Sequence, residues 1–152
     1  LLALVALIFF GFFFVRGASA GARLPAGHAA QDARAAQDAR VDPFYLRQFR
    51  DGKDFYAQGR FEEPAEVLRV AAFGLLDAPD LLLECFVYQA VGYLRMGDAA
   101  AARRCYNEVA RLKLKDRLAG ITLPPEVREK YLEGAEVMER SGRRANALSA
   151  SR

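Results

Sequence analysis

The chain has 152 residues, of which 53% are hydrophobic, and its 22 Lys and Arg against 19 Asp and Glu give a formal net charge of +3. So small an excess does not predict the strong positive field that nucleic acid binding needs, and no nucleic acid partner is expected. The only histidine, His28, and two cysteines are too few to predict a metal site, and no cofactor is expected.

The first residues form an unbroken apolar run, Leu1 to Val15, followed by the small-residue triplet Ala18-Ser19-Ala20. This order is typical of a secretory signal peptide and its cleavage region. Because the sequence starts at Leu1 and not at a methionine, we expect upstream residues, which would lengthen the run toward the ~20 residues of a membrane anchor. A buried core helix fits less well, because the run has no polar face. Residues 1–20 are therefore predicted to be a signal peptide or an anchor through residues 1–15.

Residues 21–41 are predicted to be a flexible linker. They are rich in alanine and polar residues, repeat the pentapeptide AQDAR and contain few groups that could be buried. The folded part is expected to begin at Asp42-Pro43, because aspartate is a strong N-cap and proline is tolerated at the first helical position.

Five helices are expected after the linker, and because no segment alternates like a strand, the fold class is predicted to be all-α. The helices are predicted at residues 43–58, 61–76, 80–96, 98–115 and 125–140. A helical domain over residues 42–142 is then followed by a polar tail, residues 143–152, that is predicted to be disordered.

Two stretches around Gly59 and Gly97 repeat one pattern of small residues, aromatic residues and glycine. This pattern resembles the tetratricopeptide repeat family over about half of the chain, with three departures. Pro64 stands where the family prefers alanine, and the glycines are 38 rather than 34 residues apart. The position where the family prefers tryptophan is Gln48 in the first copy and Phe86 in the second. The matching positions are Gly52, Phe55, Gly59, Pro64, Leu68 and Ala71, and then Ala90, Tyr93, Gly97, Ala102, Tyr106 and Val109. The resemblance implies two tandem antiparallel helix pairs, an α-solenoid fragment that the fifth helix would cap.

The resemblance also implies a concave groove lined by the first helix of each pair. The groove residues would be Leu46, Phe49, Lys53, Tyr56, Glu84, Val87, Val91 and Arg95. The aromatic residues would anchor a peptide, and Lys53 and Arg95 would hold an acidic group. In the alternative interpretation, Phe49, Val87 and Val91 are core residues and the two basic residues are merely solvated.

No arrangement of residues indicates catalysis, so an enzyme is not expected. Cys85 and Cys105 would differ in height by about 6 Å along antiparallel helices, which favours buried free thiols over a disulfide. The basic residues of the fourth helix lie near Glu108, which favours a solvated, ion-paired face.

The sequence therefore predicts an exported adaptor of the bacterial cell envelope that binds a peptide or protein in its groove, periplasmic or otherwise extracytoplasmic, secreted or anchored in the inner membrane. The alternative is a self-associating scaffold, since two repeats are few for stability and a homodimer would add burial.

Overall fold

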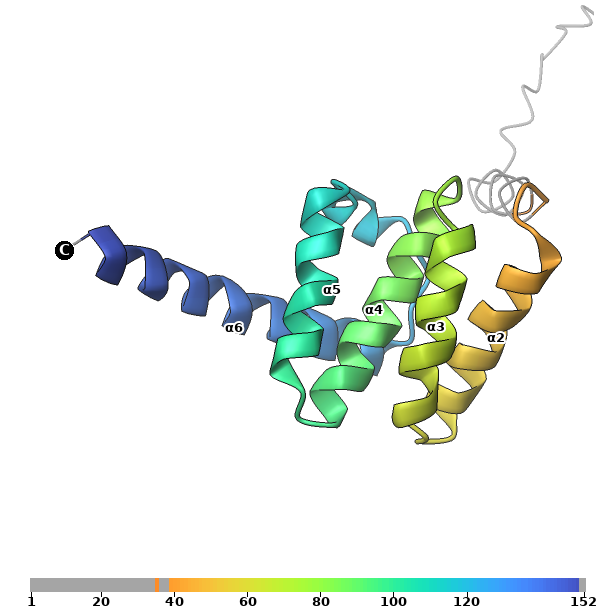
Figure 1. Cartoon of the computed structure of the whole chain (residues 1–152), viewed down its shortest axis with the longest axis horizontal. Helices are drawn as coiled ribbons and strands as arrows, with labels where there is room; N and C mark the ends of the chain where they lie inside the picture. The colour runs from red at the N-terminus through yellow and green to blue at the C-terminus, as the bar shows by residue number, and fades with distance from the viewer. Residues whose placement is uncertain (1–34, 36–38, 151–152) are drawn as a thin grey trace, which may run out of the picture.

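The computed structural model describes residue 35 and residues 39–150, with side chains to Arg143. Within these residues the fold is all-α, as predicted, and contains no strand (Figure 1). The elements are α2 (Pro43–Ala57), α3 (Glu62–Gly74), α4 (Pro79–Arg95), α5 (Ala99–Arg111), the 3-10 helix η1 (Lys115–Ala119) and α6 (Pro125–Ala150). None of these helices is long and apolar enough to cross a membrane. The apolar run and most of the predicted linker lie outside the described residues.

Two equivalent turns join α2 to α3 and α4 to α5, which confirms the predicted repeat register. Gly59 and Gly97 have φ angles of 76° and 79°, a left-handed conformation that glycine adopts without strain. The same hydrogen bonds close both helix ends: the amide of Arg60 donates to the carbonyl of Phe55 at 3.1 Å, and that of Asp98 to Tyr93 at 2.9 Å.

Helices α2 and α5 start at the expected capping residues. The carboxylate of Asp42 accepts a hydrogen bond from the amide of Phe44 at 2.8 Å, and that of Asp98 from the amide of Ala101 at 2.9 Å. These bonds satisfy amides that have no partner within the first helical turn.

Helix α4 lies at the centre of the fold and packs against α2, α3, α5, α6 and η1. Most of its side chains are buried, including Leu83, Val87 and Ala90, each 0% exposed. Across the α2–α4 contact, Lys53 forms an ion pair with Glu84, whose side chain is 1% exposed. The Lys53 ammonium also lies 5.2 Å from the centre of the Phe49 ring, so this partly exposed charge is held at the contact between α2 and α4.

Helix α5 ends at Arg111 and not near Lys115 as predicted. Lys113 adopts a left-handed conformation with φ 55°, and the amide of Leu114 donates to the carbonyl of Val109 at 3.0 Å. The chain then forms η1 and an anchored connection to α6. Arg128 holds this connection by donating to the carbonyls of Leu118 at 2.8 Å and Ile121 at 2.6 Å.

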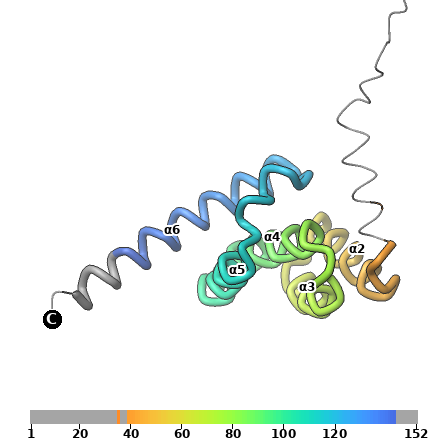
Figure 2. Tube along the Cα trace, turned by 90° about the horizontal axis from the view of Figure 1, so that it is seen from above, coloured from red at the N-terminus to blue at the C-terminus, as the bar shows by residue number. Residues whose placement is uncertain are grey.

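Helix α6 covers the side of α4 that faces away from α3 (Figure 2). Its far end extends beyond α5 (Figure 1). The predicted end at Ser141-Gly142 is wrong, because the helix continues to Ala150 and takes in most of the predicted tail. Ser141 stays helical by donating its hydroxyl to the carbonyl of Val137 at 2.9 Å, and one helical glycine costs only about 1 kcal/mol.

Candidate binding cleft

The apolar residues predicted to line a concave groove are buried in the core. Phe49 is 4% exposed, and Val87 and Val91 are 0% exposed, which favours the core interpretation. Helix α6 accounts for part of this burial, because it contacts α4 near Leu94, which lies on the same helical face as Val87 and Val91.

The polar residues of the predicted groove do not form a peptide clamp. Lys53 and Glu84 pair with each other, so neither charge faces an open groove. Tyr56 is half-buried, with its ring 5.2 Å from that of Tyr88. Arg95 is exposed at the end of α4, away from the Lys53 ion pair. The structure therefore does not bring the predicted groove residues together as an open site.

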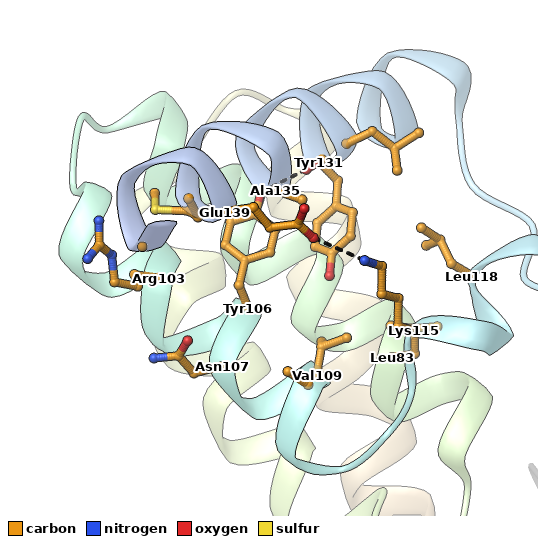
Figure 3. Close-up of a pocket in the computed structure, with 14 residues that line it drawn as sticks. Leu83, Arg103, Tyr106, Asn107, Val109, Lys115, Leu118, Tyr131, Ala135 and Glu139 are labelled. Carbon is orange, nitrogen blue, oxygen red and sulfur yellow. Dashed lines mark hydrogen bonds and ion pairs between the residues drawn. The ribbon is translucent and has the colours of Figure 1, made fainter. Parts of the chain in front are cut away.

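An open cleft of about 460 Å³ lies instead between α5 and α6 (Figure 3). Its floor is mainly apolar, with Leu83 from α4, Val109 from α5, Leu118 from η1 and Ala135 from α6. Met138 adds a flexible thioether side chain that can adapt to an occupant. The size falls within the range of known ligand sites.

Two tyrosines form the inner wall of the cleft. The hydroxyl of Tyr106 donates to the backbone carbonyl of Tyr131 at 2.9 Å, and the two ring centres are 4.8 Å apart. Gly134 makes room for Tyr106, since a Cβ there would collide with the Tyr106 hydroxyl and lie 2.6 Å from Leu94 Cδ1. Burial raises the pKa of Tyr131 to about 12, and it raises the pKa of Tyr106 as well, so both rings stay neutral.

The hydroxyl of Tyr131 is the polar group on the floor. Figure 3 shows it pointing away from α6, toward Val109 and Leu83. Tyr131 is 5% exposed, and within the part of the chain that the structure describes, this hydroxyl makes no hydrogen bond to protein. A buried hydroxyl without a partner is costly, so an occupant of the cleft that offers an acceptor is favoured.

The rim of the cleft carries three charged side chains and one amide. Lys115 and Glu139 form an ion pair at 3.0 Å, which links η1 to α6 across the cleft. This pairing lowers the pKa of Glu139. Arg103 and Asn107 lie one turn apart on α5 and line the same cleft, and their side chains form no ion pair or hydrogen bond with another described residue.

A comparison of the two helix junctions explains why the cleft exists. Leu68 and Tyr106 match in the repeat pattern, and Cys85 and Tyr131 are each the seventh residue of a helix that begins with proline. In the first junction the Cys85 thiol donates to the Leu68 carbonyl at 3.1 Å, and α4 packs closely on α3. In the second junction two rings occupy this place, and α6 does not follow α5 closely.

The cysteines lie outside the cleft lining. Cys85 and Cys105 are buried free thiols, and desolvation raises the pKa of each to about 12. Among the described residues no group of His, Cys, Asp and Glu is arranged to hold a metal ion. On α5, Glu108 pairs with Arg111 at 2.6 Å, as expected for a solvated face.

The repeat pattern includes Tyr106 but gives no sign of a cleft between Tyr106 and Tyr131. The last helix was expected to cap the two helix pairs, and α6 packs mainly on α4. The available signal was the pair of large rings where the first junction has Leu68 and Cys85. A comparison with protein-family models, curated proteins and solved structures finds no match to this chain.

Proposed function

We propose that this protein is an exported, non-catalytic adaptor that binds a segment of another protein in the α5–α6 cleft. The single observation that carries the proposal is an open, mainly apolar cleft of about 460 Å³ whose rim holds Arg103 and Asn107 without partners among the described residues. Apolar area supplies affinity, and a few placed polar groups supply orientation. The tetratricopeptide-like helix pairs would serve as the support that holds α5 and α6.

The proposal is tested by filling the cleft. Ala135 lines it and is half-buried, so Ala135→Trp should occupy the space with an indole ring. The matched control is Ala57→Trp, which adds the same ring at an exposed position at the end of α2. Proteins crosslinked to the wild type in cell-envelope extracts should be lost with Ala135→Trp and kept with Ala57→Trp. If the wild type and both variants crosslinked the same proteins equally, the cleft would be ruled out as the binding site.

Export is part of the proposal and depends on the apolar run at residues 1–15. The protein should appear in the periplasmic or inner-membrane fraction of its host. A cytosolic location in that fractionation would refute this part without affecting the cleft.

An exposed apolar patch at the end of α3 and in the turn after it favours a second candidate, a self-associating scaffold. Phe73 is 73% exposed and Leu76 is 63% exposed, next to the shallow hollow between α3 and α5 that Phe86 and Leu112 line. Large exposed apolar side chains that gather in one place are typical of interaction surfaces. Sedimentation of the wild type and Phe73→Glu separates the two candidates. A dimer that Phe73→Glu dissociates supports the scaffold, and a wild-type monomer supports the adaptor.

A further inference from the structure

We propose that the α5–α6 cleft binds an acidic amphipathic peptide segment, which places apolar side chains on the cleft floor and a carboxylate on Arg103. The proposal rests on the proposed adaptor function and names the chemistry of its partner. Three features of the cleft carry it: the charge balance of the rim, the position of the Tyr131 hydroxyl, and the spacing of the polar groups.

The charge balance of the cleft selects an acidic partner. The charged residues that line the cleft are Arg103, Lys115 and Glu139. Lys115 and Glu139 form an ion pair at 3.0 Å and neutralise each other. The charge of Arg103 is therefore not balanced by another lining residue. A guanidinium at the edge of an apolar surface binds a carboxylate through two parallel hydrogen bonds, which favours a partner with Asp or Glu beside its apolar residues.

The Tyr131 hydroxyl favours a polypeptide over a simple amphiphile such as a fatty acid. This hydroxyl lies on the apolar floor (Figure 3), where a hydrocarbon tail offers no acceptor. A backbone carbonyl offers one among apolar side chains. The Arg103 and Asn107 side chains then lie one helical turn apart on the rim. A peptide can match all three groups, whereas a fatty acid carries one polar end.

The site is tested by selecting ligands without assuming a sequence. Random 12-residue peptides displayed on phage are selected on the full chain, and the strongest binders are synthesised and titrated by fluorescence anisotropy. We expect the selected peptides to combine apolar residues with Asp or Glu. Their affinity should fall as salt concentration rises, because the rim charges are exposed to solvent.

Two pairs of variants locate the contacts. Arg103→Glu should weaken peptide binding at least tenfold, while Arg104→Glu, the same change on a neighbouring exposed residue that does not line the cleft, should alter it less than twofold. Tyr131→Phe should weaken binding about fivefold without lowering the thermal midpoint, because it removes only a hydroxyl without a described partner. In contrast, Tyr106→Phe removes a hydroxyl that bonds to the backbone and should lower the midpoint.

The outcomes separate this inference from the function it rests on. If Ala135→Trp abolishes peptide binding and Arg103→Glu leaves it intact, the cleft remains the binding site, but the proposal that the partner is acidic is wrong. If no selected peptide is sensitive to Ala135→Trp, both the partner and the cleft are rejected. If laurate binds with the same dependence on Arg103 and no peptide binds, the ligand is an amphiphile and the peptide proposal is wrong.

Discussion

Replacing Gly134 by alanine tests the contact on which the cleft depends, the packing of α6 against the body of the fold. Alanine is the better helix former by about 1 kcal/mol. However, the new Cβ would collide with the Tyr106 hydroxyl and lie 2.6 Å from Leu94 Cδ1. Overpacking of this kind destabilises by roughly 1–3 kcal/mol. We therefore expect Gly134→Ala to lower the free energy of unfolding by about 1 kcal/mol.

Helix α6 supplies its own control for this substitution. Gly142 lies in the same helix, and a Cβ there would have no neighbour within 4 Å. Gly142→Ala should therefore gain the helix propensity alone, up to about 1 kcal/mol. The measurement is urea unfolding of both variants, followed by circular dichroism at 222 nm. The two substitutions should move the midpoint in opposite directions.

A double substitution tests whether the Tyr106 hydroxyl is the group with which the new Cβ at position 134 collides. In the Tyr106→Phe background the hydroxyl is absent, so Gly134→Ala should lose less stability than it does in the wild type. We expect a coupling of at least about 0.5 kcal/mol between the two positions. If Gly134→Ala stabilised the protein as much as Gly142→Ala does, α6 would not lie on Tyr106, and the reasoning behind the cleft would be refuted.

Three further predictions concern the body of the fold. Lys113→Gly should raise the free energy of unfolding in urea titrations by about 1 kcal/mol, because glycine relieves the left-handed conformation at φ 55°; a loss of stability would contradict this. Lys53→Met should lower the free energy of unfolding by roughly 2 kcal/mol, because the buried Glu84 carboxylate loses its ion pair with Lys53. An unchanged urea midpoint would show that this ion pair contributes little to stability. Burial raises the pKa of Cys85 from 9.0 to about 12, so folding favours the neutral thiol. Its contribution to stability is then fully present below pH 9 and is lost as the pH rises toward 12, and a thiol reagent such as DTNB should label Cys85 and Cys105 only after unfolding.

Those parts of the fold that depend on neighbouring residues could be predicted from the sequence. Asp42 and Asp98 cap helices through bonds that span two or three residues, and Gly59 and Gly97 end helices through bonds that span five. A local sequence pattern contains all the groups that make these contacts, so it is sufficient to predict them.

The cleft could not be predicted in the same way, because it depends on the direction that α6 takes. That direction follows from the contact between Tyr106 and Tyr131, which are 25 residues apart, and from the Arg128 bonds that anchor the connection before α6. The burial of the apolar residues expected to line a groove could not be predicted for the same reason. Val87 and Val91 match the pattern of an open helix face, but no local signal shows that a helix 40 residues later contacts α4.

The central position of α4 has a consequence for how the protein unfolds. In long repeat arrays each unit contacts only its neighbours, and the ends fray independently. Here α4 contacts every other described element, so removing any one of them uncovers part of the same helix. We therefore expect the amides of α4 to exchange with deuterium only when the whole domain opens. The domain would then unfold in a single two-state transition and would not unfold progressively from one end.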